Sequence, residues 1–146
     1  MRIRLFFLGK TRNPHLRALL EDYRRRIARF NPIDLVEWKT TDGGSWTIAE
    51  ARGKQTSAPV VLLDAAGRQQ SSGEFARWLA KQMNTGQKQL IFLLGGAEGF
   101  AEEARQKADV LLSLSQMTLP HELARVVLLE QLYRAFARLR DHPYPR

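Results

Sequence analysis

The residue pattern best suited to holding a ligand is a glycine-rich turn, Gly95-Gly96-Ala97-Glu98-Gly99. It follows the apolar run Gln89–Leu94, so it lies at the carboxyl end of an expected parallel strand, where open sheets bind ligands. Glycines there let a ligand approach the backbone closely. The spacing lacks the GxGxxG of dinucleotide sites and the Lys-Ser/Thr of a P-loop. The turn is a candidate ligand site, and a tight turn without a ligand is the alternative.

Two side chains that can exchange protons or bind anions lie at the start of the last expected helix. His121 follows Pro120, where a neutral histidine can donate, accept or act as a base, or else cap the helix or face solvent. Arg125 projects into an apolar arc of the same helix, where a charge is costly without a partner. We expect a carboxylate, a ligand or an RNA phosphate as that partner. The alternative is an arginine that extends to water from near the helix start.

The composition excludes several other kinds of site. The chain has 146 residues and no cysteine, which excludes disulfides, thiolate zinc sites and cysteine nucleophiles. His15 and His142 have no carboxylate or histidine at ligand spacing, so we expect no metal site. No Ser/His/Asp set and no pair of carboxylates stands out.

The charge balance indicates a polyanionic partner. Lys and Arg total 23 against 15 Asp and Glu, a formal net charge of +8. Nucleic acid is the commonest such partner, although a basic protein that is merely soluble has the same balance. The run Arg24-Arg25-Arg26, with Arg29, is either a patch for the RNA backbone or a solvated face with cations at a helix C-terminus.

An α/β domain must position these residues, because apolar runs of strand type alternate with segments of helical period. Asn13 as N-cap, followed by Pro14, begins one helix, and a capping box at Ser71 and Glu74 begins another, which ends near Gly86. Gly67 is expected to turn the chain before the second of these helices. The length fits one domain, residues 1–146. Strands are expected at 2–8, 33–38, 59–64, 89–94 and 110–114, a loop at 40–45, a short helix before 55, and further helices at 14–30, 101–108 and 121–140.

The last helix carries more apolar surface than one sheet requires. Its apolar arc is about 200° wide, roughly twice what packing on one sheet needs. A second copy of the chain is the simplest partner for the excess, and burial by the helix's own domain is the alternative. The arc is formed by Val126, Leu128, Leu129, Leu132, Tyr133, Phe136 and Leu139.

No segment suggests export or a membrane. The first strand begins almost at Met1, which leaves no room for a signal peptide. No apolar run approaches the ~20 residues that span a bilayer. A cytoplasmic location without membrane contact is therefore expected.

Over nearly its whole length the chain resembles the small SPOUT methyltransferases of the large-subunit ribosomal RNA pseudouridine-N3 type, the RlmH family. The resemblance is carried by LGK in the first strand, VLLDAAG, LLGGAEGF and, above all, LSLSQMTLPHELARVVLLEQLYRAF. It implies a SPOUT-type parallel sheet flanked by helices, with a C-terminal trefoil knot, one of the rare exceptions to unknotted topology. It also implies a homodimer whose active site is completed across the interface.

The same resemblance implies a set of site residues. The cofactor is S-adenosylmethionine, and the substrate is a pseudouridine in 23S rRNA on the assembled ribosome, without a metal. His121, Arg125, Arg134 and Tyr144 match catalytic positions near the reacting centre. Cofactor contacts, largely through backbone groups, are implied for Leu63, Gly95, Leu114, Ser115, Gln116, Met117, Thr118 and Leu119.

The chain departs from the family pattern at two places. It ends Tyr144-Pro145-Arg146, where the family has a histidine between tyrosine and the terminal basic residue, and its segment Lys39–Gln55 is shorter. The first departure puts a tail histidine base in doubt, and the second bears on the RNA-facing edge. Two alternatives follow: a SPOUT enzyme acting on another RNA such as tRNA, and a catalytically silent ribosome-binding protein.

Overall fold

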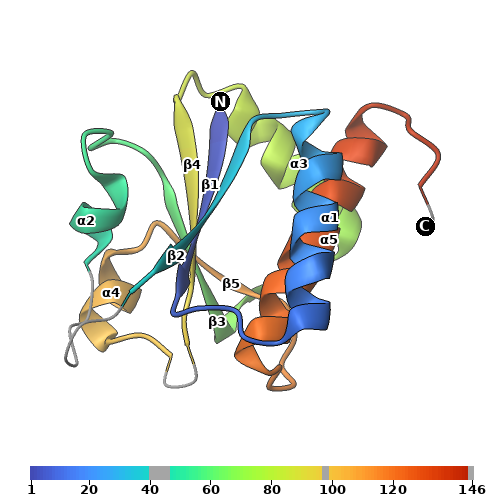
Figure 1. Cartoon of the computed structure of the whole chain (residues 1–146). Coiled ribbons are helices and arrows are strands. Elements are labelled where there is room, and N and C mark those ends of the chain that lie inside the picture. The colour runs from blue at the N-terminus through green and yellow to red at the C-terminus, as the bar shows by residue number, and fades with distance from the viewer. Residues whose placement is uncertain (40–46, 97–98, 145–146) are drawn as a thin grey trace.

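Parallel strands form the central sheet of the computed structural model, which describes residues 1–39, 47–96 and 99–144 (Figure 1). The spatial order is β2-β1-β4-β3-β5. Because each neighbouring pair is parallel, the carboxyl ends of the strands meet at one edge of the sheet. The strands are β1 (Arg2–Leu8), β2 (Ile33–Trp38), β3 (Val60–Gln69), β4 (Gln89–Leu94) and β5 (Val110–Ser113).

Helices cover both faces of this sheet (Figure 1). On one face lie α1 (Pro14–Ala28), α3 (Ser72–Met83) and α5 (His121–Leu139). On the other lie α2 (Ile48–Arg52) and α4 (Glu102–Lys107). The expected α/β class with a parallel sheet between helices is confirmed.

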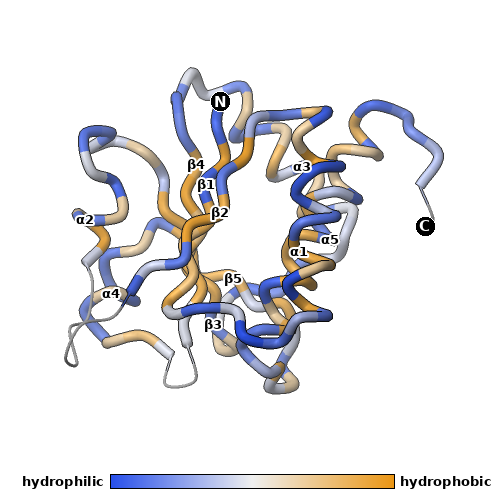
Figure 2. The backbone as a smooth tube through the Cα atoms, in the orientation of Figure 1, coloured by the Kyte–Doolittle hydropathy of each residue, from blue (hydrophilic) through white to orange (hydrophobic). Residues whose placement is uncertain are grey.

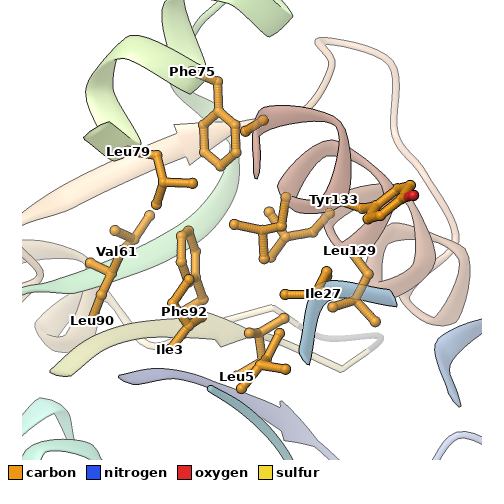
Figure 3. Packing of buried hydrophobic residues seen from close by; sticks show 14 of the residues in the cluster. Ile3, Leu5, Ile27, Val61, Phe75, Leu79, Leu90, Phe92, Leu129 and Tyr133 are labelled. Carbon is orange, nitrogen blue, oxygen red and sulfur yellow. The ribbon is translucent and has the colours of Figure 1, made fainter. Parts of the chain in front are cut away.

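Strand alternation divides the core into two layers. In β4, Leu90 and Phe92 face the layer of α1, α3 and α5, whereas Ile91 and Leu93 face that of α2 and α4. All four side chains have no exposed surface, as expected for a central parallel strand covered on both faces. Figure 2 shows hydrophobic residues concentrated along the strands, and Figure 3 shows Ile3, Leu5 and Phe92 packed with residues of the helices.

The predicted helix starts are confirmed at two places. The Asn13 side chain accepts hydrogen bonds from the first backbone N–H groups of α1, and Pro14 occupies its first position. At α3, the Ser71 hydroxyl accepts from the Glu74 N–H and the Glu74 carboxylate accepts from the Ser71 N–H, both at 3.1 Å. This is the predicted capping box.

The wide apolar arc of α5 is buried by its own domain except at Leu139, which is 40% exposed. The helix packs on the sheet and lies between α1 and α3, touching both. Its buried residues include Leu128, Leu132 and Phe136, each without exposed surface. A helix in the middle of a three-helix layer needs an arc this wide, so the arc is no argument for a second copy of the chain.

The prediction that β3 ends at Asp64 and turns at Gly67 is wrong. The strand continues to Gln69 and bulges, because Leu63 and Arg68 both pair with Leu112 of β5. Gly67 lies in this bulge, and a Cβ built on it would be 2.6 Å from the Leu111 carbonyl oxygen. The glycine permits a close approach of two strands and does not end one of them.

Two further expectations concern the middle of the chain. The short helix expected before Gln55 is α2. The predicted loop at residues 40–45 lies outside the described residues, as does part of the shortened 39–55 segment. Among the described residues, no helix has the length and apolar character needed to cross a bilayer.

Candidate functional site

A cavity of about 160 Å³ opens at the carboxyl edge of the sheet. Its floor is formed by the ends of β3, β4 and β5 at Leu63, Leu94 and Leu112, and its rim by the glycine turn, the segment after β5 and the first turn of α5. This is the edge where parallel sheets bind ligands. Among the described residues, the lining consists of Leu63, Asp64, Ala65, Leu94, Gly95, Gly96, Gly99, Phe100, Leu112, Leu114, Ser115, Met117, Thr118, Leu119, His121 and Ala124.

Glycines keep one wall of this cavity thin. A Cβ on Gly95 would lie 3.2 Å from the Gly99 backbone and from the Phe100 ring. A Cβ on Gly96 would lie 3.3 Å from the Leu8 carbonyl oxygen at the end of β1. Gly99 has φ +73°, a conformation that favours glycine. A side chain at Gly95 or Gly96 would therefore have to displace these neighbours, so glycine is what allows the turn to pack this closely.

Internal hydrogen bonds shape the segment between β5 and α5. The buried Ser113 hydroxyl lies 3.0 Å from the carbonyl oxygens of Ala65 and Ser115, so it can donate to either. The Met117 N–H donates to the Ser115 hydroxyl at 3.0 Å. Because Ala65 belongs to the β3 bulge, Ser113 ties the segment to the strand beside it.

The cavity gathers the sequence-predicted cofactor residues, with one exception. Leu63 and Gly95 line it at the ends of β3 and β4. Gln116 is not part of the lining. The other predicted residues in the lining are Leu114, Ser115, Met117, Thr118 and Leu119.

Asp64 is a cavity residue that sequence reasoning missed. Its carboxylate lies 2.5 Å from Nε of Arg105 in α4 and accepts a hydrogen bond from the Ala66 N–H. The carboxylate raises the pKa of Arg105, mainly through the attraction of its charge. The available signal was an acidic residue directly after the buried run VVLL, at a strand's carboxyl end. Asp64 places a negative charge at the cavity wall.

His121 lies at the mouth of the cavity, at the first position of α5. Its side chain is 37% exposed, and its Nε2 lies 3.9 Å from the Glu122 carboxylate. The histidine can reach both the cavity and solvent, which suits a group that exchanges a proton.

Arg125 lies behind the cavity wall and is not part of its lining. The side chain has no exposed surface. Its guanidinium donates to the Thr11 hydroxyl at 2.7 Å and to the Leu8 carbonyl at 2.8 Å, and it stacks 4.8 Å from the Phe7 ring centre. Burial lowers the pKa of Arg125. Its hydrogen-bond partners in the chain are therefore neutral groups of β1 and the following loop, where we expected a carboxylate, a ligand or a phosphate.

Arg134 and Tyr144 lie away from the cavity, in a cluster of their own. At 1.5 Å of rise per residue, Arg134 is about 20 Å along α5 from His121. Its Nε donates to Glu130 at 2.9 Å, and its guanidinium lies 5.1 Å from the centre of the Tyr144 ring. The structure thus brings His121 to the cavity but leaves Arg134 and Tyr144 of the same chain outside it.

The Tyr144 ring is held on the α1–α5 layer. It packs edge-on against Tyr133 with ring centres 4.6 Å apart, and its hydroxyl lies 3.3 Å from Tyr23 and from Glu130. Burial raises the pKa of Tyr144, and the Tyr23 hydroxyl adds to the effect. Pro145 and Arg146, on which the tail departure rests, lie outside the described residues.

The described residues contain no group of three or more His, Cys, Asp or Glu side chains that could hold a metal ion. The Arg24–Arg26 run is partly neutralised, because Arg24 pairs with Glu21 and Arg26 with Asp22.

Comparison with known proteins gives both a family and a fold. Residues 1–145 match the family described as "Predicted SPOUT methyltransferase". Over 146 residues, with 100% of both chains covered, the sequence is 42% identical to a protein of Solibacter usitatus named ribosomal RNA large subunit methyltransferase H.

Solved structures with low sequence identity share the fold. The tRNA (m1G37) methyltransferase of Aquifex aeolicus superposes with a TM-score of 0.60 at 13% identity, over 100% of this chain and 75% of that one. The SpoU methyltransferase AviRb of Streptomyces viridochromogenes, in complex with AdoMet, gives a TM-score of 0.50 at 14% identity, over 90% and 56%.

Proposed function

The chain belongs to the SPOUT methyltransferase family, and we propose that it uses S-adenosylmethionine to methylate N3 of a pseudouridine in large-subunit ribosomal RNA. The observation that carries the proposal is the cavity at the carboxyl edge of the sheet. It is lined by the residues for which the family resemblance implies cofactor contacts. The relative named for large-subunit rRNA, aligned over the full chain, supports the substrate class.

The cavity lining fits the proposed cofactor. Gly95, Gly96 and Gly99 line the cavity without side chains, so a ligand can approach their backbone. Apolar walls at Leu63, Leu94 and Leu114 suit an adenine ring, and the segment 114–119 offers backbone groups to its polar edge. The carboxylate of Asp64 suits the cationic or hydroxyl-bearing part of the molecule. When bound, S-adenosylmethionine supplies a methyl group on a positively charged sulfur.

The chain's own residues orient the base and manage its proton. The N3 nitrogen carries a proton that must leave before or as the methyl group arrives, and positioning supplies much of the rate. His121 is the histidine at the cavity mouth, so it either takes this proton or passes it to solvent. Arg125 acts indirectly in this proposal, because it lies behind the cavity lining and its two terminal nitrogens donate to Thr11 and Leu8.

We propose that the protein is a homodimer, because of where Arg134 and Tyr144 lie. Both match active-site positions of the family, yet Arg134 lies far along α5 from the cavity of its own chain, and Tyr144, beyond the end of α5, packs beside Arg134. A second copy that brings its Arg134 cluster to the first copy's cavity completes the site. Met117 at the cavity rim is 77% exposed and Leu123 on α5 is 36% exposed, so apolar side chains are available for such a contact.

We also propose that the C-terminal part of the chain is knotted, as in other SPOUT proteins. β5 is an edge strand beside β3, whereas the first turns of α5 contact the end of β1 and the loop after it. The segment 114–120 therefore crosses the carboxyl ends of β3 and β4. It shares the cavity with the glycine turn and with the β3 bulge, the region that a threaded chain would pass.

A ribosomal substrate implies action in the cytoplasm, and the net charge of +8 suits RNA. The test is methyl transfer from labelled cofactor to large ribosomal subunits, free large-subunit rRNA and tRNA. The proposal requires label in the ribosomal samples and none in tRNA. Label in tRNA alone would identify a SPOUT enzyme with another target, and ribosome binding without transfer would identify a silent binding protein.

A further inference from the structure

The loop between β1 and α1, residues 9–13, lies directly behind the wall of the cofactor cavity. Phe7 of β1 pairs with Leu94 of β4, which lines the cavity. The next residue, Leu8, places its carbonyl oxygen 3.3 Å from where a Cβ of Gly96 would be. The loop starts at Gly9, with φ +87°. The loop therefore continues from a strand end that packs against the cavity wall.

The first two turns of α5 fasten the loop. The Glu122 carboxylate accepts hydrogen bonds from the backbone N–H groups of Arg12 at 2.9 Å and Asn13 at 3.0 Å. Arg125 holds the Thr11 hydroxyl at 2.7 Å. Glu122 and Arg125 each follow a residue that lines the cavity, His121 and Ala124. The backbone of the loop is therefore fixed relative to the cavity without the use of its own charged side chains.

Those charged side chains point outward. Thr11 has no exposed surface, whereas Lys10 and Arg12 on either side of it are exposed. Within the described part of the chain, neither Lys10 nor Arg12 forms an ion pair. The neighbouring Arg17 differs, because it donates to the Thr11 carbonyl and lies 3.9 Å from Glu37. Two unpaired cations are thus held on a fixed loop beside the first turn of α5, where His121 lines the cavity.

We propose that Lys10 and Arg12 bind backbone phosphates of the RNA strand whose base enters the cofactor cavity. The inference rests on the proposed function and deepens it by naming where the strand runs. Phosphate contacts fix the register of a nucleic acid without reading its sequence. A loop held by Glu122 and Arg125 loses little further freedom on binding, so its cations set the distance between strand and cavity.

A second pair of exposed cations forms another surface to which RNA phosphates could bind. Arg25 and Arg29 lie one helical turn apart on α1, are exposed, and form no ion pair within the described residues. Arg25 lies about 17 Å and Arg29, the C-terminal cap of α1, about 23 Å from the α1 start along its axis, toward the amino ends of the strands. This pair carries the same charge as Lys10 and Arg12 but is not in the lining of the cavity and is not held beside it by α5, which makes it the control for charge.

The experiment compares wild type with the double variants K10A/R12A and R25A/R29A, which lose the same charge. Binding to large ribosomal subunits is measured across a series of KCl concentrations, and kcat and KM for the subunits are measured beside it. Two lost phosphate contacts should lower the slope of log affinity against log salt by about 1.4 for a single strand. K10A/R12A should raise KM on the order of tenfold with kcat and cofactor affinity unchanged, and R25A/R29A should change KM less than about twofold.

Equal changes of KM and salt slope in the two variants would show a general charge effect and overturn the inference. A K10A/R12A protein with the KM and salt slope of wild type would also overturn it. The proposed function can fail separately. If wild type binds the subunits but transfers no methyl group, while the salt slope still depends on Lys10 and Arg12, the function is wrong and the phosphate contacts stand. If wild type methylates the subunits and K10A/R12A matches it in KM and slope, the contacts are wrong and the function stands.

Discussion

The guanidinium of Arg125 donates to the carbonyl oxygen of Leu8 at 2.8 Å, which joins the second turn of α5 to the end of β1. The two residues are far apart in the sequence, and the bond is made without exposed surface on the arginine. Between them they hold the wall behind the cofactor cavity. Arg125 is, in this account, a positioning residue.

Replacing Arg125 with methionine should destabilise the protein strongly. The substitution leaves the Leu8 carbonyl and the Thr11 hydroxyl without their donor in a buried place, and unsatisfied buried groups of this kind cost about 1–3 kcal/mol each. The free energy of unfolding from urea titration should fall accordingly. The exposed Arg25→Met serves as control, with a change within about 0.5 kcal/mol. An R125M protein as stable as wild type would remove the positioning role.

Cofactor binding should depend on Gly95 and be indifferent to Gln116. A Cβ at Gly95 already meets the Gly99 backbone and the Phe100 ring at 3.2 Å, so Gly95→Val must either displace these cavity-lining residues or direct a methyl group into the cavity. Calorimetry with S-adenosylmethionine should show an affinity loss on the order of a hundredfold, since one clash with a bound ligand forfeits a few kcal/mol. Gln116→Ala should bind like wild type. Equal affinities in a folded G95V protein would place the cofactor elsewhere.

The hydrogen bonds between Glu122 and the loop 9–13 should make the stability of the protein depend on pH in the acidic range. Hydrogen bonds from the backbone N–H of Asn13 and, less strongly, of Arg12 lower the pKa of Glu122. A carboxyl with a lowered folded-state pKa contributes stability above its unfolded pKa and loses it as pH falls through the folded pKa. Melting temperatures from about pH 6 to pH 3 should therefore fall more steeply for wild type than for Glu122→Gln.

Glu103→Gln is the control for that series. The pKa of Glu103 is also lowered, by Lys107, but both side chains are well exposed and solvent screens the pair. Its melting profile should follow wild type. Parallel profiles for wild type and E122Q would mean that the carboxylate does not clamp the loop.

The shared active site can be tested by mixing inactive dimers. His121→Ala and Arg134→Ala should each lower methyl transfer. In a mixed dimer one of the two sites regains an intact cavity and an intact arginine, so random exchange should recover about a quarter of wild-type activity. His121→Ala mixed with Gly95→Val should recover nothing, because both defects lie in the cavity. Recovery in neither mixture would place Arg134 in the site of its own chain or outside any site.

Much of the fold could be predicted from the sequence, because its signals are local. The bounds of β1, β2 and β4 follow from apolar runs, and the α1 and α3 starts from Asn13 and the Ser71–Glu74 pair. The β3 bulge could not be predicted, because glycine is needed at position 67 only when β5 lies beside β3 and brings Leu111 close. A glycine in a strand and a glycine in a turn look alike along the chain.

The candidate site was predicted by resemblance more than by chemistry. The segment 114–119 has few side chains that suggest binding, because its backbone is what it offers. Arg125 was correctly marked as needing a partner, but periodicity within α5 could not show that neutral groups of β1 would supply it. The apolar arc of α5 was equally ambiguous, since a helix between two others and a helix at a dimer interface require the same pattern.

The proposed reaction is tested most directly by the identity of its product. Large ribosomal subunits lacking the modification are incubated with the protein and S-adenosylmethionine, and the rRNA is digested to nucleosides for mass spectrometry with fragmentation. The account predicts a single new nucleoside, pseudouridine with one added methyl group on N3, absent from reactions with Gly95→Val. A methyl group on a ribose, on another base or on tRNA, with none on pseudouridine, would contradict it.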